Sequence, residues 1–88
     1  MIKEIVKEDI RTSIGAESKI VLFNDDFNTF PHVIQSLVEV LGHSVAQAEQ
    51  CAMIVHYKGK YPVKSGPKND LLPRCSALLD RGLSAEIQ

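Results

Sequence analysis

Hydrophobic residues recur along this chain in runs that predict three short strands. Residues 19–23 combine β-branched, aliphatic and aromatic side chains and end at polar residues, which is typical of a strand. Residues 60–64 are predicted as an edge strand, because Pro62 has no backbone N–H to donate to a central ladder. After a turn over residues 65–67 and a helical stretch, residues 83–88 are predicted as the last strand.

Between these runs, apolar residues follow the three- and four-residue spacing of helices. The first helix is predicted from Phe30 to the residue before Gly42, with Asn28 or Thr29 accepting its first free amide hydrogens. The second is predicted to open at a capping box over residues 44–47 and to end near His56, before a glycine.

A third helix is predicted after the second strand. Asp70 is expected to cap it, Pro73 to lie in its first turn and Gly82 to end it. The residues expected to face inward from the three helices are Phe30, Val33, Ile34, Leu37, Val38, Leu41, Ala48, Cys51, Ala52, Val55, Leu71, Leu72, Cys75, Leu78 and Leu79.

Together these elements predict one α+β domain with the element order βααβαβ. Three strands cannot bury a face alone, so we expect a two-layer sandwich in which three helices cover one face of a mainly antiparallel sheet. This core domain would span residues 18–88. Residues 1–17 offer no identifiable partner face and are expected to be a mobile N-terminal extension.

Composition narrows the possible partners. The 88 residues carry a formal net charge of −1, with lysine and arginine scattered along the chain, so the basic footprint of a nucleic-acid binder is missing. No apolar run approaches the roughly 20 residues that span a bilayer, and the charged N-terminus lacks the apolar region of a secretory signal. We therefore expect no nucleic-acid or membrane partner and a cytoplasmic location.

The two cysteines are expected to be buried reduced thiols, because Cys51 and Cys75 each lie in an apolar helical pattern without Cys-x-x-Cys spacing. A metal site would have to recruit His32, His43 or His56, and these residues share no recognised ligand spacing. No metal or cofactor is expected.

Polar residues between the first strand and the first helix are candidates for a binding site. Asn24, Asp25 and Asp26 could simply satisfy backbone groups where the strand ends. They could also converge with His56 at one rim, where carboxylate, amide and imidazole acceptors would surround a cationic ligand. His56 also has a simpler interpretation: it lies at the C-terminal end of a helix, where the helix dipole favours the cationic form of histidine.

Catalysis is a weaker interpretation of the same residues. Asp25 or Asp26 could orient His56 as a general base. No serine or cysteine lies in a recognisable nucleophile setting, and both cysteines are expected to be buried. The chain is therefore not expected to be an enzyme.

Two blocks of residues resemble the signatures of a known family. Residues 22–27 carry an Asn-Asp-Asp triplet after the first strand, and residues 53–60 carry Val-His-Tyr-x-Gly-Lys about thirty residues later. The triplet alone would be unspecific, but the combination is specific. In this order and spacing the blocks resemble the ClpS family, over roughly residues 18–88.

That resemblance implies an adaptor of the bacterial N-end rule pathway. Such an adaptor binds proteins that begin with Leu, Phe, Tyr or Trp and delivers them to the N-terminal domain of a Clp AAA+ unfoldase, of the ClpA or ClpC type. It further implies that Asn24, Asp25 and His56 bind the substrate α-ammonium, with Asp25 acting through water. Asp26 and Asn28 would shape the loop and position the first substrate peptide group. The implied hydrophobic pocket comprises Phe30, Val33, Ala52, Val55 and Leu83.

The chain departs from the family pattern at positions that affect the site. Asn28-Thr29 stands where the family usually has Thr-Pro, and Ala52 stands where many members carry Met. The smaller alanine would widen the cavity or let Phe30 fill it. The same small sandwich also resembles the C-terminal domain of ribosomal stalk proteins, so a non-catalytic interaction module with another partner is the alternative.

Overall fold

The computed structural model describes residues 17–88. The elements are β1 (Glu17–Phe23), α2 (Phe30–Leu41), α3 (Val45–Lys58), β2 (Lys60–Pro67), α4 (Lys68–Asp80) and β3 (Ser84–Ile87). Their order confirms the predicted βααβαβ arrangement. Residues 1–16 lie outside the described residues, and the expected mobile extension stays a prediction.

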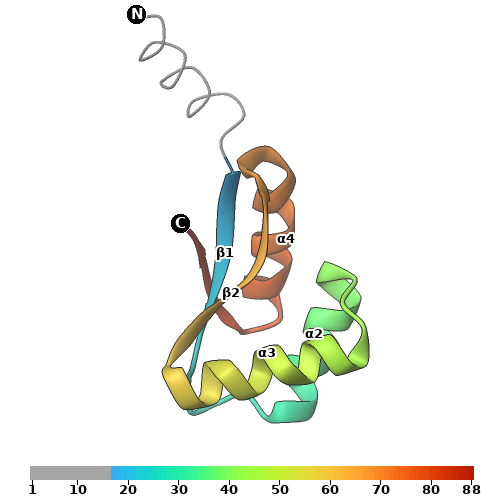
Figure 1. The fold of residues 1–88 in the computed structure, drawn as a ribbon, viewed down its shortest axis with the longest axis vertical. Helices are drawn as coiled ribbons and strands as arrows, with labels where there is room; N and C mark the ends of the chain where they lie inside the picture. Colours follow the sequence, from blue (N-terminus) through green and yellow to red (C-terminus); the bar gives the residue numbers. More distant parts are fainter. Residues whose placement is uncertain (1–16) are drawn as a thin grey trace, which may run out of the picture.

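The strands form one antiparallel sheet in the order β2-β1-β3. β2 is an edge strand, as Pro62 predicts. The helices form the second layer: α4 runs alongside the strands, and α2 and α3 lie toward the end of the sheet at which β1 finishes (Figure 1). The prediction of a two-layer α+β sandwich is thereby confirmed.

The edge strand β2 contains a bulge, and a hydrogen bond at this bulge joins the strand to the connection between α2 and α3. Ile20 pairs with Lys64 and Val21 with Pro62, so Val63 is an extra residue in β2. Val63 is buried in the core. Its carbonyl accepts a hydrogen bond from Nε2 of the buried His43 at 2.8 Å, since a carbonyl can only accept. The imidazole thus satisfies a backbone group near the bulge and fixes the α2–α3 connection against the edge strand.

The predicted boundaries around the third helix were wrong. Residues 65–67 continue β2 instead of forming a turn, because Ser18 and Glu17 offer ladder partners to Gly66 and Pro67. α4 therefore begins at Lys68 with Pro67 as its N-cap, and Asp70 lies in the first turn without capping the helix. As a consequence, Pro73 falls inside the helix.

The remaining helix ends follow the sequence more closely. Thr29 caps α2, its Oγ1 accepting a hydrogen bond from the N–H of His32 at 3.2 Å. Ser44 caps α3 in the same way through the N–H of Gln47. α3 ends at Lys58, and its C-cap Gly59 has a φ of 91°, in the left-handed region that glycine adopts without strain.

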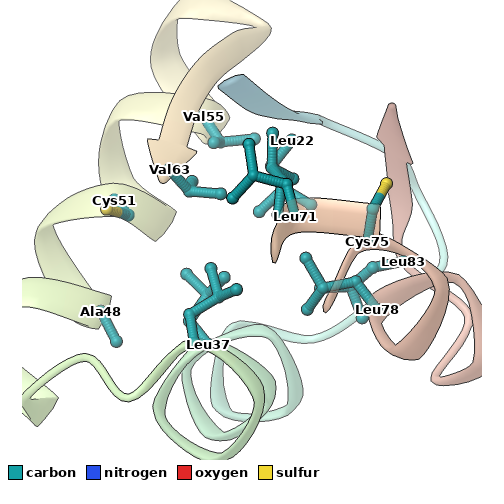
Figure 2. Packing of buried hydrophobic residues seen from close by; sticks show 12 residues of the cluster. Leu22, Leu37, Ala48, Cys51, Val55, Val63, Leu71, Cys75, Leu78 and Leu83 are labelled. Carbon is teal, nitrogen blue, oxygen red and sulfur yellow. The ribbon is translucent and has the colours of Figure 1, made fainter. Parts of the chain in front are cut away.

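The core gathers side chains from all three helices around the sheet (Figure 2). On α3 the predicted inward residues Ala48, Cys51, Ala52 and Val55 are all buried. Both cysteines are free and buried, as predicted, and burial raises the pKa of each thiol.

Three predicted core positions are exposed: Leu72 at 48%, Leu79 at 51% and Phe30 at 43%. On α4 the buried face is Leu71, Cys75 and Leu78, at the spacing of one helical stripe. Leu72 and Leu79 each follow a buried residue by one position, which turns them about 100° away from the core.

Within residues 17–88, no helix combines the length and apolar character needed to cross a bilayer. The cytoplasmic location expected from the sequence stays a prediction.

Adjacent leucines on α4 provide a test of this packing. We predict that Leu78→Ala lowers the free energy of unfolding by about 2–5 kcal/mol, because Leu78 is fully buried and its loss leaves a cavity. Leu79→Ala is the matched control and should cost less than about 1 kcal/mol, because that side chain is half exposed. Urea denaturation of the two variants measures the difference, and equal losses would contradict the observed helix face.

Candidate functional site

One backbone hydrogen bond brings the two polar segments of the sequence together. The N–H of Asn24, directly after β1, donates to the carbonyl of Gly59 at 2.9 Å. Gly59 is the C-cap of α3, and His56 lies in the last turn of that helix. Asn24 and His56, 32 positions apart in the sequence, are therefore held at the same end of the sheet.

Asp25 organises the loop that follows. Its Oδ1 accepts hydrogen bonds from the N–H groups of Phe27 and Asn28, each at 2.9 Å. Its Oδ2 accepts from Nδ2 of Asn28 at 2.8 Å and from Oγ of Ser84 at 3.3 Å. A carboxylate offers about four lone-pair positions, so these four donors occupy most of its capacity.

The pKa of Asp25 reflects this environment. Partial burial by itself raises the pKa, but hydrogen bonds from the backbone and side chain of Asn28, from Phe27 and from Ser84 outweigh it. The pKa consequently lies below its ordinary value of 3.8. Asp25 is therefore ionised at neutral pH, and its negative charge is fixed at the rim of the site.

Asn28 extends the same network to the end of α4. Its Nδ2 also donates to the carbonyl of Gly82 at 3.0 Å. Gly82 has a φ of 86°, and a Cβ added there would meet Oδ1 of Asn28 at 4.0 Å. A side chain at position 82 would thus be disfavoured by the backbone conformation rather than by lack of space.

Two further contacts fix Leu83 beside the loop. Nε2 of His32 on α2 donates to the carbonyl of Arg81 at 2.8 Å. The guanidinium of Arg81 pairs with Glu39 of α2 at 2.8 Å. Because Arg81 and Gly82 directly precede Leu83, these bonds set where its buried side chain enters the site.

A cavity of about 290 Å³ lies between the loop, α2, α3 and the start of β3. Its apolar wall includes the buried Ala52, Val55 and Leu83 and the half-buried Val33. Every residue predicted for the site lines this one cavity: Asn24, Asp25, Asp26, Asn28, Phe30, Val33, Ala52, Val55, His56 and Leu83.

Sequence reasoning missed four residues of the site. Leu22 and Phe23 also line the cavity. The alternation of side chains along a strand gives a signal for Leu22, which lies two residues before Asn24 and so faces the same way. Ser84 and Gly82, the partners of Asp25 and Asn28, had no such signal because their contacts join distant parts of the chain.

The rim of the cavity is exposed and polar on one side and aromatic on the other. Asn24, Asp26 and His56 are exposed. The Phe30 ring meets the His56 ring edge to face, with centroids 5.4 Å apart and an interplanar angle of 81°. The Tyr57 ring lies 5.3 Å from His56 on a second edge contact. The imidazole thus makes edge contacts with two aromatic rings at the cavity mouth.

The geometry offers an apolar hollow directly beside hydrogen-bond acceptors. It can enclose one hydrophobic side chain while a positively charged group near the rim meets the oxygens of Asn24 and the carboxylates. Within residues 17–88, His, Cys, Asp and Glu side chains do not gather in groups of three or more that could hold a metal ion.

Comparison with known proteins identifies the family. The model of the family described as "ATP-dependent Clp protease adaptor protein ClpS" matches residues 15–86. The ClpS adapter protein of Salmonella arizonae is 34% identical over 59 residues, which cover 65% of this chain and 56% of the relative. The ClpS adapter protein of Cronobacter sakazakii is 33% identical over 58 residues, covering 64% of this chain and 55% of the relative.

A solved structure shares the fold. It is Agrobacterium tumefaciens ClpS2 bound to L-phenylalaninamide, with a TM-score of 0.78 and 20% sequence identity, covering 82% of this chain and 94% of that one. The described residues thus have the α+β fold of this ClpS structure. The chain belongs to the ClpS family of ATP-dependent Clp protease adaptor proteins. It spans about 56% of the length of the Salmonella arizonae relative.

The Asp25 network predicts a specific stability effect. We expect Asp25→Asn to lower the free energy of unfolding by about 1 kcal/mol at pH 7, because an amide in place of Oδ2 presents a donor to Nδ2 of Asn28. Asp26→Asn, at the exposed neighbouring carboxylate, is the control and should change little. Urea denaturation of both variants gives the values.

The effect should depend on pH. The folded-state pKa of Asp25 is lowered, so its contribution is present above the unfolded value of about 3.8 and is lost as the pH falls through the folded value. The stability difference between the parent protein and Asp25→Asn should therefore shrink below about pH 4. A difference that stays constant down to pH 2 would contradict the assigned network.

Proposed function

We propose that this protein is a non-catalytic adaptor that binds proteins with a bulky hydrophobic N-terminal residue and delivers them to a Clp AAA+ unfoldase. The observation that supports this most directly is the cavity of about 290 Å³ that opens beside Asn24, Asp25 and His56. Its volume lies at the small end of ligand sites and suits one side chain rather than a larger ligand.

Such a substrate has two chemical handles next to each other. The side chain of its first residue would enter the cavity and pack against Val33, Ala52, Val55 and Leu83. Its α-ammonium would donate hydrogen bonds to Asn24 and to neutral His56. Asp25 is already engaged by four protein donors, so its charge would attract the ammonium at longer range or through water. Asp26 and Asn28, whose Oδ1 is left to accept, would meet the first peptide group.

Energetics favour a requirement for both handles. Fully burying a leucine or phenylalanine side chain contributes about 1.5–3 kcal/mol. Hydrogen bonds to a charged group contribute about 1.5–3 kcal/mol each. Micromolar affinity needs about 8 kcal/mol, which neither handle supplies alone. An internal leucine lacks the charge and an N-terminal lysine fills the apolar wall poorly, so only an N-terminal hydrophobic residue satisfies both requirements.

The ligand of the Agrobacterium ClpS2 structure has this chemistry. L-phenylalaninamide carries a free α-amino group beside an aromatic side chain. Delivery to the N-terminal domain of a ClpA- or ClpC-type unfoldase is proposed from the family description, which assigns ClpS to an ATP-dependent Clp protease.

Acetylation of the substrate tests the requirement for a free α-ammonium group. A labelled peptide beginning with Leu or Phe should bind with micromolar or better affinity, and its N-acetylated twin should bind at least about tenfold more weakly, because the charge is removed. Fluorescence anisotropy measures both. Equal affinities would refute the proposed function and would favour an interaction module that does not read the N-terminus.

Single substitutions test the acceptors. His56→Ala and Asn24→Ala should each weaken binding of the free-amine peptide by about 1.5 kcal/mol, or roughly tenfold, because the ammonium loses an acceptor. Asn69→Ala on α4 is the control, since Asn69 is also exposed but lies outside the cavity. Unfolding curves confirm that the variants fold, and parent-like affinity for both site variants would exclude this role.

A further inference from the structure

A second apolar groove borders the cavity of about 290 Å³ beside Asn24, Asp25 and His56, which we call the recognition cavity. It encloses about 760 Å³ on the outer side of α2 and α3, and it is lined mainly by carbon atoms of Phe30, Ile34, Met53 and Tyr57. Phe30 and Ala52 line both the groove and the recognition cavity. The two hollows are therefore neighbours that share a wall.

The groove side of α3 is unusual for a surface helix. Ala48, Cys51 and Val55 face the core, where Figure 2 shows them with Leu37 and Leu71. Met53 and Tyr57, four positions apart on another face of the helix, are nevertheless apolar or aromatic and are 48% and 75% exposed. Exposed apolar side chains that gather along a groove commonly mark a binding site.

The wall between the two hollows is small. Ala52 contributes only a methyl group, so the half-exposed Phe30 ring is the largest side chain that both hollows share. In an extended peptide, residues one and three point to the same side and lie about 7 Å apart. A peptide whose first side chain fills the recognition cavity thus presents its third side chain on the same face. The spacing of about 7 Å is enough to reach past one intervening side chain.

We propose that this groove binds an apolar side chain at the third position of the substrate. The inference rests on the proposed function, because the occupant of the groove is tethered to the residue in the recognition cavity. Tethering makes the second contact intramolecular, so even a shallow apolar groove is filled at high effective concentration. Glu49 and Lys58 border the groove with opposite charges, so selection there depends on apolar character rather than on charge.

Peptides that vary only at the third position test this proposal. Leu-Ala-Leu and Leu-Ala-Gly peptides with free N-termini and identical remaining sequence should differ in affinity by about three- to tenfold in favour of leucine, as expected for partial burial of one side chain. Both acetylated twins serve as controls. Loss of all dependence on the free amine would refute the proposed function itself, whereas amine dependence without third-position dependence would refute only the groove.

A matched pair of variants locates the effect. Met53→Gln makes the groove more polar without adding charge near the ammonium site, and should remove most of the third-position preference. Leu72→Gln is the control: Leu72 is also 48% exposed on a helix, but it lies on α4 outside both hollows. Both variants should keep the preference for a first-position leucine over glycine. A third-position preference that survives in Met53→Gln would overturn the proposal.

A direct readout comes from the methionines. The chain contains two, Met1 and Met53, so ¹³C-methyl methionine labelling places an NMR reporter in the groove. The Met53 methyl resonance should shift with the Leu-Ala-Leu peptide and shift much less with Leu-Ala-Gly. Equal shifts would overturn the proposal. A groove that instead joins two copies of the chain would also overturn the proposal. It would be seen as a concentration-dependent Met53 shift without peptide, together with dimer sedimentation that Met53→Gln abolishes.

Discussion

The hydrogen bond from the Asn24 N–H to the Gly59 carbonyl is the contact on which the site depends. It joins the end of the central strand to the end of α3, two points that no local pattern connects. Because β1 pairs with both other strands, a fixed end of β1 also fixes the position of the loop that follows it. The left-handed conformation of Gly59 directs the chain from α3 into β2 and leaves its carbonyl free to accept this bond.

Around that contact, the loop is held in place by hydrogen bonds among its own polar groups and to neighbouring elements. Asp25 accepts four hydrogen bonds, and Asn28 donates both of its amide hydrogens, one of them to the carbonyl of Gly82. These bonds connect the loop to the start of β3 and to the end of α4. Ordering the loop before a ligand arrives reduces the conformational entropy that binding would otherwise cost.

This arrangement divides the roles of three residues that look alike in the sequence. Asn24 and Asp26 are exposed at the rim, whereas Asp25 between them turns toward the protein. Asp25 thus shapes the loop and contributes charge, whereas its two neighbours present their polar groups at the cavity mouth. Beyond the rim, Phe30 and Ala52 separate the recognition cavity from the outer groove, so their sizes control how far the two hollows communicate.

The sequence by itself determined the element types and their order, and it predicted most of the residues that line the cavity. Strand runs, caps such as Ser44 and the inward stripe of α3 are local signals, because they depend on neighbours within a few positions. The tertiary structure decided the rest. Gly66 and Pro67 became strand because distant Ser18 and Glu17 offered partners, which moved the start of α4 to Lys68. Leu72 and Leu79 are exposed because α4 packs against the core only through the stripe of Leu71, Cys75 and Leu78. Likewise, the bonds of Asp25 to Ser84 and of Asn28 to Gly82 form only when separate elements meet, so no spacing in the sequence could reveal them.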